Sequence, residues 1–154
     1  MAMDTQNSDT IIREAFEGDL ADIYDIEQSA VDDPWSAEAL SGVFGHDYSM
    51  NLVSVDKQGM LLGYIFCDII ADEMNIIYLV THRDFRRRGI ARRLVVKAID
   101  LARHRGARNC YLEVRSKNNA AIALYSACGF TLQSVRKKYY ANDNDDAQLM
   151  ALSL

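Results

Sequence analysis

FRRRGIARRL, from Phe85 to Leu94, marks the point at which the hydrophobic pattern of the chain changes, and five of its ten residues are arginine. Ahead of it, apolar runs are β-rich; beyond Gly89 they recur at helical spacing as far as about Arg105. The stretch therefore joins a strand to a helix. Because a helix N-terminus favours anions, each arginine there costs about 0.3–1 kcal/mol through the helix dipole. A bound anion would reverse the sign of that cost, so the stretch predicts a phosphate site.

Two familiar phosphate-binding motifs are excluded at this junction. The spacing is neither the GxxxxGK[ST] of a Walker loop nor the GxGxxG of a dinucleotide site. Contact with nucleic acid is the alternative use for clustered arginines. Only Phe85 is aromatic within the stretch, which does not support a platform for stacked bases.

The segments on either side of the junction predict a mixed β-sheet with helices on its faces. An antiparallel meander precedes the junction, and a strand–helix–strand unit includes it. Seven strands are expected, at 11–12, 51–55, 60–70, 75–81, 110–114, 131–140 and 147–153. Four helices are expected, at 19–33, 35–45, 89–105 and 118–128, and a polar turn at 142–146. The fold class is thus α/β (α+β), as one domain over 11–154 that follows a flexible N-terminus at 1–10.

Length and composition support a single folded domain with a sizeable core. The chain has 154 residues, of which 49% are hydrophobic, so it can bury a sizeable core. No signal-peptide core and no apolar run near 20 residues is present, and the expected location is the cytoplasm without membrane contact. Cys67, Cys110 and Cys128 are widely spaced with no CxxC pair, so reduced thiols are expected and a metal site is not.

Charge is unevenly distributed along the chain. Residues 1–80 hold 16 acidic and 2 basic residues, whereas residues 81–117 hold 12 basic and 3 acidic residues. The basic segment suits an anionic partner, and the acidic half suits a cationic one. A solvated surface with chance clustering of charge is the plainer interpretation.

The loop Arg86 to Ala91, RRRGIA, resembles the R/Q-x-x-G-x-G/A loop of the GCN5-related N-acetyltransferase (GNAT) family. DIEQSAVDDPWS, YLEVRSKNNAAIALYSACGF and RKKYY resemble segments of its bacterial RimI subfamily, so the similarity runs from about Ile11 to Leu154. The resemblance implies the GNAT fold and acetyl-CoA as cosubstrate, with no metal. It also implies direct transfer, in a ternary complex, to the N-terminal alanine of a small-subunit ribosomal protein.

The same resemblance assigns residues to the cofactor. The backbone of one strand should pair with the pantetheine arm, the arginine loop should hold the diphosphate, and the residue that opens the later helix should contact the cofactor. These residues are Leu79, Val80 and Thr81, then Arg86, Arg87, Arg88, Gly89, Ile90, Ala91 and Arg92, and finally Asn118. Asn118 is also a good helix N-cap, and the two roles are compatible.

Two residues match the catalytic positions of RimI-like enzymes. Strand alternation places Glu113 on the face opposite Leu112 and Val114, which by itself predicts an exposed strand residue. By resemblance, Glu113 is the general base that takes the proton of the amine. Tyr125 would by itself be a packing residue, and by resemblance it is the acid that protonates the leaving thiolate.

The resemblance places Trp35, Tyr139 and Tyr140 beside the peptide substrate, although Trp35 could equally be a core residue. Departures from the subfamily are His82-Arg83 in place of Asp-Pro and Ala141 in place of a frequent proline. Two other functions stay open: acetylation of a lysine or small amine, and a non-catalytic module that binds CoA or RNA. A monomer without stable nucleic-acid binding is expected.

Overall fold

The computed structural model describes residues 9–140 and 144–154. Most of the flexible N-terminus expected at 1–10, and part of the polar turn expected at 142–146, lie outside the described residues. Within the described part, no helix is long and apolar enough to cross a membrane.

Seven strands form one sheet in the order β1-β2-β3-β4-β5-β7-β6. Every neighbouring pair is antiparallel except β4 and β5, which are parallel and are joined by α3. The predicted mixed sheet with seven strands and four α-helices is therefore confirmed. The strands are β1 (Thr10–Glu14), β2 (Ser49–Asp56), β3 (Leu61–Ile70), β4 (Glu73–Thr81), β5 (Asn109–Arg115), β6 (Thr131–Tyr140) and β7 (Asp145–Ser153). The helices are α1 (Leu20–Ala30), α2 (Ala37–Ser41), α3 (Ile90–His104) and α4 (Asn119–Ala127), with short 3-10 turns at Glu17–Asp19 and Arg83–Phe85.

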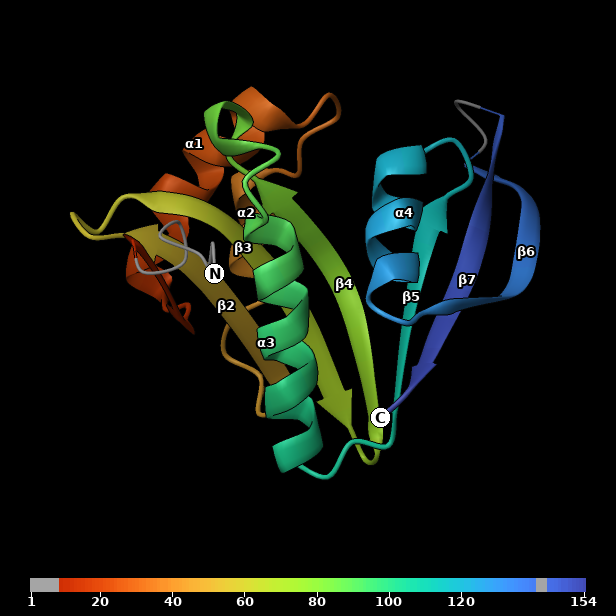
Figure 1. The fold of residues 1–154 in the computed structure, drawn as a ribbon. Coiled ribbons are helices and arrows are strands. Elements are labelled where there is room, and N and C mark those ends of the chain that lie inside the picture. The colour runs from red at the N-terminus through yellow and green to blue at the C-terminus, as the bar shows by residue number, and fades with distance from the viewer. Residues whose placement is uncertain (1–8, 141–143) are drawn as a thin grey trace, which may run out of the picture.

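The helices form two layers, one on each face of the sheet (Figure 1). α1 and α2 pack through Ile23, Ile26 and Leu40 on aromatic residues of β3 and β4. α3 and α4 cover the opposite face, where Leu94 and Tyr125 belong to one buried cluster with residues of β3, β4 and β5. Each strand of the centre thus contributes alternate side chains to two different cores.

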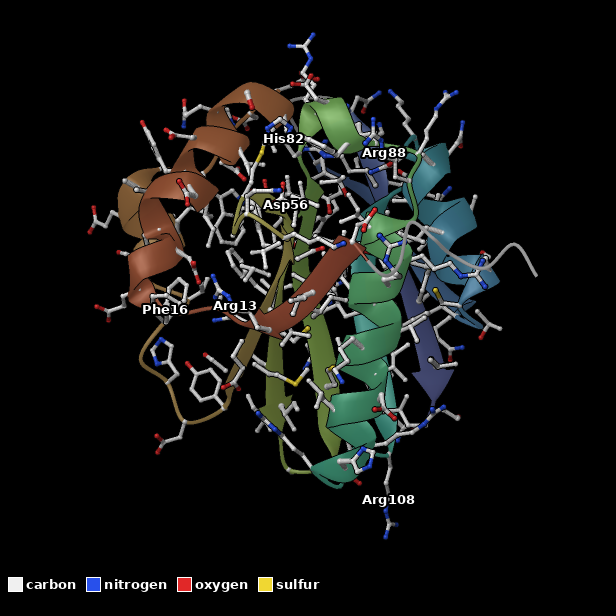
Figure 2. The ribbon with its side chains drawn as sticks, turned by 60° about the vertical axis from the view of Figure 1, so that its left-hand side comes forward. Arg13, Phe16, Asp56, His82, Arg88 and Arg108 are labelled. Carbon is white, nitrogen blue, oxygen red and sulfur yellow. The ribbon has the colours of Figure 1, made fainter. Side chains whose placement is uncertain are left out.

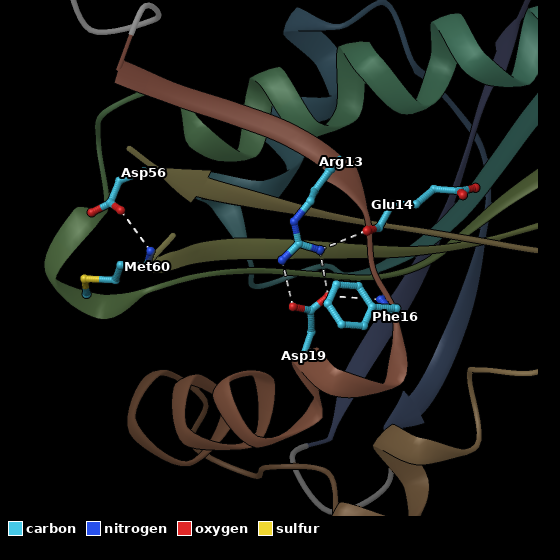
Figure 3. A network of polar contacts seen from close by, with 6 residues as sticks. All are labelled: Arg13, Glu14, Phe16, Asp19, Asp56 and Met60. Carbon is cyan, nitrogen blue, oxygen red and sulfur yellow. Dashed lines mark hydrogen bonds and ion pairs between the residues drawn. The ribbon is translucent and has the colours of Figure 1, made fainter. Parts of the chain in front are cut away.

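An ion pair fixes the start of α1 to the first strand (Figure 3). Both guanidinium nitrogens of Arg13 donate to the carboxylate of buried Asp19, at 2.8 and 2.9 Å. The backbone N–H of Phe16 donates to the same carboxylate at 3.0 Å. Burial alone would raise the pKa of Asp19, but the Arg13 and Phe16 hydrogen bonds outweigh it and leave that pKa below its ordinary value.

The sheet splits between β4 and β5. The two strands pair only from Glu73 opposite Asn109 to Ile76 opposite Leu112, and then diverge (Figure 1). The divergence begins at a β-bulge, because Phe66 and Cys67 of β3 pair with Tyr78 and Ile76 and leave Ile77 without a partner. A bulge bends and twists its strand, which turns the rest of β4 away from β5.

A close helix–strand contact sets α3 beside this split. A Cβ atom on Gly63 of β3 would lie 2.9 Å from the carbonyl oxygen of Val80 and 3.1 Å from Ile90. Any larger residue would push apart the first turn of α3 and the end of β4. Gly63 therefore allows the arginine-rich helix start to lie against the carboxyl end of β4.

Candidate active site

The split in the sheet holds a hollow of about 380 Å³. We call it the β4–β5 hollow; its lining residues are Asn75, Ile76, Ile77, Tyr111, Leu112, Glu113, Tyr139, Tyr140 and Leu149. Beyond Ile76, the edge of β4 that faces β5 has no strand partner among the described residues, although β3 pairs with β4 as far as Thr81. Leu79, Val80 and Thr81 therefore lie where an extended ligand could hydrogen-bond to backbone groups of β4.

The amino end of α3 is arranged to receive an anion. Its N-cap is Gly89 in the left-handed region (φ 77°), no side chain caps the helix, and no acidic residue occupies the first turn. Arg87 also has a positive φ of 65°, so two left-handed residues turn the backbone just ahead of the helix. The N–H groups of Ile90, Ala91 and Arg92 consequently point out of the helix end with no side-chain acceptor.

A second and larger hollow, of about 850 Å³, runs along α3. We call it the α3 hollow; its basic lining residues are Arg88, Arg92, Arg93, Lys97 and Arg103, and its others include Gly89, Val96 and Cys128. Figure 2 shows Arg88 and His82 at one end of the molecule and Arg108 at the other, as the direction of α3 requires. The predicted residues Arg88, Gly89 and Arg92 thus lie together.

The arginine side chains of the junction are not equivalent. Arg86 donates a hydrogen bond of 2.8 Å to the carbonyl oxygen of Ala30, at the carboxyl end of α1, so its side chain does not point into the α3 hollow. Arg93, which the sequence did not single out, donates to the carbonyl oxygen of Arg88 at 3.1 Å. The buried Nε of Arg93 has no hydrogen-bond partner within residues 9–140 and 144–154. An unsatisfied donor here fits a site completed by a bound anion.

Glu113 lies exposed on β5 between buried Leu112 and Val114, as strand alternation predicted. Its carboxylate faces the β4–β5 hollow and lies 3.4 Å from the guanidinium of Arg136 on β6. Tyr139 and Tyr140 line the same hollow, and the guanidinium of Arg115 lies 3.9 Å from the centre of the Tyr140 ring. Three of the predicted site residues, one acidic and two aromatic, are therefore brought together by β5 and β6.

Tyr125 projects from α4 into the core on the opposite face of the sheet from Glu113. It is buried, and its ring meets that of Phe130 edge-on with 5.7 Å between centroids. Burial raises the pKa of the Tyr125 hydroxyl well above its ordinary value, so the group stays protonated. Asn118 caps α4, because its side chain accepts a hydrogen bond of 3.1 Å from the N–H of Ala121.

Trp35 lies outside the lining of both hollows. Its ring stacks on Tyr78 of β4 with 4.4 Å between centroids and 9° between planes. Its backbone N–H donates at 2.8 Å to Glu27, a fully buried carboxylate of α1 that also accepts from Tyr64 and Tyr78 at 2.6 Å each. Glu27 was not predicted from the sequence, in which its only signal is a charged residue on the apolar side of α1.

No group of three His, Cys, Asp or Glu side chains suited to a metal ion occurs in 9–140 and 144–154. Cys67 and Cys110 are buried and Cys128 is half-buried, and all three are free thiols. Burial raises the pKa of Cys110 to about 12, so its thiol is protonated and weakly nucleophilic at neutral pH.

The sequence of this chain matches one protein family and several proteins that share one name. The sequence model of the acetyltransferase (GNAT) family matches residues 14–130. The ribosomal protein bS18-alanine N-acetyltransferase of Salmonella typhimurium is 35% identical over 139 residues, which is 88% of this chain and 92% of that protein. The Escherichia coli protein of the same name is 33% identical over 138 residues, with the same coverage.

Solved structures agree with the sequence relatives. The crystal structure of the ribosomal-protein-S18-alanine N-acetyltransferase from Escherichia coli superposes with a TM-score of 0.88 at 32% identity, over 94% of this chain and 93% of that chain. Ard1 from Thermoplasma volcanium shares the fold, with a TM-score of 0.83 at 23% identity over 94% and 97% of the two chains. The family resemblance and the fold expected from the sequence are both confirmed.

Proposed function

Because this chain belongs to the acetyltransferase (GNAT) family and is an acetyltransferase, we propose that it acetylates the N-terminal alanine of ribosomal protein bS18. The observation that carries the proposal is the β4–β5 hollow, where Glu113 meets Tyr139 and Tyr140 at the split in the sheet. An acceptor amine needs a base beside it and access to the acetyl donor through the split in the sheet. Relatives of that activity match over 88% of this chain.

The helix start of α3 fits the diphosphate of acetyl-CoA. Acetyl-CoA would supply the acetyl group as a thioester. The uncapped N–H groups after Gly89 and the unsatisfied Nε of Arg93 are donors without acceptors. Arg88 and Arg92 add positive charge at the same place. Arginines at a helix start interact unfavourably with the helix dipole. A bound anion, held by these donors and positive charges, would offset that cost.

The free edge of β4 suits the extended part of the same molecule. Among the described residues, no strand pairs with β4 on that side from Leu79 to Thr81, so the backbone N–H groups there that point away from β3 are available. One of them would donate to the thioester carbonyl oxygen, where negative charge develops as the amine attacks. The residues that hold the diphosphate and the edge that holds the carbonyl are adjacent because Gly63 lets α3 approach β4 closely.

Proton transfer is assigned to two residues on opposite faces of the sheet. Glu113 takes the proton of the attacking α-amine, directly or through a water molecule. Tyr125 donates its proton to the thiolate as the carbon–sulfur bond breaks. Burial keeps the Tyr125 hydroxyl protonated until that step, and the same dry surroundings disfavour a free thiolate, so the proton moves as the carbon–sulfur bond breaks. Transfer is direct, with no acyl-enzyme.

Charge supports a basic peptide as acceptor. The half of the chain that forms α1, α2 and the first four strands carries 16 acidic and 2 basic residues over positions 1–80. Complementary charge raises the rate of encounter with a cationic segment and orients it. The N-terminal segment of a ribosomal protein that binds RNA is expected to be cationic.

The test uses two peptides with acetyl-CoA. One begins with Ala-Arg and has a free α-amine; the other is its N-terminally blocked twin with one internal lysine. Mass spectrometry then locates the added acetyl group. The proposal requires acetylation of the free α-amine, with the blocked peptide modified far more slowly. Modification of the lysine alone would reject the N-terminal acceptor and retain the family assignment.

A further inference from the structure

We propose that Arg136 is a specificity residue that repels positively charged acceptors from Glu113, so that α-amines are acetylated in preference to lysine side chains. This inference rests on the proposed function, since it concerns which amine enters the β4–β5 hollow. It assigns to Arg136 a role in rejecting the wrong acceptor, whereas Glu113 is assigned the chemistry.

Arg136 contacts two residues that line the β4–β5 hollow. Its Nη1 lies 3.4 Å from Oε1 of Glu113, and its guanidinium carbon lies 5.4 Å from the centre of the Tyr139 ring. Arg136 thus bridges the proposed base and an aromatic wall of the hollow. The pairing of β6 with β7 shifts register between Arg136 and Tyr140, and Lys138 within that interval has a φ of 52°. The distorted strand lets the Arg136 guanidinium contact both Glu113 and Tyr139, which line the hollow.

The other charged groups near Glu113 are Arg115 and Asp145, which have opposite signs. Arg115 lies over Tyr140, and Asp145 at the start of β7 is buried. Burial, with Glu113 as a further cause, raises the pKa of Tyr140, which keeps that hydroxyl neutral. The charged group in direct contact with the Glu113 carboxylate is therefore the guanidinium of Arg136.

This charge balance decides which amines are admitted. A lone carboxylate would attract an ammonium group and could remove its proton within the site, so a lysine side chain would be acetylated. With Arg136 paired to it, Glu113 offers little net attraction to an ammonium, and a neutral amine is preferred. At pH 7 about one α-amine in ten is neutral, against about one lysine in 2,500, given ordinary pKa values of about 8 and 10.4.

The pair has little value as a stabilising contact. The side chains of Arg136 and Glu113 are 57% and 31% exposed, and ion pairs at such sites contribute little to folding. The neighbouring Lys137 provides a matched comparison. It forms an ion pair of 3.4 Å with Asp146, which does not line the hollow, whereas Arg136 pairs with Glu113, which does.

The experiment compares the wild type with Arg136→Gln, Arg136→Lys and Lys137→Gln. Values of kcat/KM are measured by mass spectrometry, at pH 7 and pH 9, for the free α-amine peptide and the blocked lysine peptide. We expect Arg136→Gln to raise the lysine-to-α-amine ratio at least about tenfold at pH 7, since a unit charge about 4 Å away is removed from a partly exposed site. The gain should shrink at pH 9, where more of the lysine is already neutral. Arg136→Lys and Lys137→Gln should keep the wild-type ratio.

A binding measurement separates this inference from the proposed function. At pH 6, where the α-amine is protonated, calorimetric titration should show that the Ala-Arg peptide binds Arg136→Gln more tightly than it binds the wild type. An unchanged affinity together with an unchanged ratio would overturn the role of Arg136. Absence of α-amine acetylation by the wild type would instead overturn the proposed function, and the affinity comparison would still decide the role of Arg136.

Discussion

Glu27 is expected to be the most costly single carboxylate to remove from this fold. Its side chain is 0% exposed and accepts three hydrogen bonds: from Tyr64 and Tyr78 at 2.6 Å each, and from the backbone N–H of Trp35 at 2.8 Å. These donors come from β3, β4 and the segment between α1 and α2. Glu27→Ala would leave all three without an acceptor and would also create a cavity.

The magnitude follows from the number of stranded donors. An unsatisfied buried donor costs about 1–3 kcal/mol, so three of them would cost about 3–9 kcal/mol before any relaxation. Because the tyrosine hydroxyls can partly reorient, we expect Glu27→Ala to lower the free energy of unfolding by about 3–5 kcal/mol. At about 2–4 °C per kcal/mol for a chain of this size, the melting temperature should fall by about 6–20 °C.

Thermal and urea unfolding would measure the effect, with two comparison variants. Glu27→Gln keeps the volume and one acceptor oxygen, so it should lose only about 1–2 kcal/mol. Asp25→Ala removes an exposed carboxylate from the same helix and should change stability by less than about 0.5 kcal/mol. A loss below about 1 kcal/mol for Glu27→Ala would refute the reasoning that Glu27 holds α1, β3 and β4 together.

Three further predictions follow from the described residues. Burial raises the pKa of Tyr64, Tyr78 and Tyr125, so the folded chain keeps protons that the unfolded chain loses above about pH 10. The free energy of unfolding should therefore fall above that pH, by up to about 1.4 kcal/mol per pH unit for each tyrosine. A urea midpoint that stays flat from pH 9 to 11 would contradict this. Gly89→Ala places a Cβ at a φ of 77° and 3.1 Å from Arg93, so calorimetry should show CoA affinity reduced about 5- to 30-fold, given a cost of about 1–2 kcal/mol for a left-handed non-glycine residue. An affinity within twofold of wild type would argue against the helix-start site. Tyr125→Phe should lower turnover by at least about tenfold while CoA affinity stays within about twofold, as for loss of a general acid. Equal losses of turnover and affinity would indicate a packing role for Tyr125.

Local patterns predicted most of the secondary structure. The apolar spacing after Gly89 predicted α3, which runs from Ile90 to His104, and alternation along β5 predicted the exposure of Glu113. These features depend on residues close in sequence, whose periodicity reports which face is buried. The arginine junction was recognisable for the same reason, because a helix dipole acts on its own first turn.

Features that depend on long-range pairing were not predictable. The position of β7 between β5 and β6, and the bulge at Ile77 that opens the sheet, arise from strand partners distant in sequence. The hydrogen bond from the Arg86 side chain to the carbonyl oxygen of Ala30, 56 positions away, is another such contact. Glu27 is satisfied by Tyr64 and Tyr78, at separations of 37 and 51 residues. No periodicity within one segment carries such information.

The most direct test of the account is to measure Glu113→Gln in two ways, with the Ala-Arg peptide as acceptor. Turnover reports whether Glu113 takes the proton of the amine, and calorimetric CoA affinity reports whether the helix-start site is intact. The account predicts that turnover falls at least about 100-fold, as expected for loss of a general base, while CoA affinity stays within about twofold. Turnover within tenfold of the wild type would contradict the assignment of Glu113, and with it the mechanism built on the β4–β5 hollow.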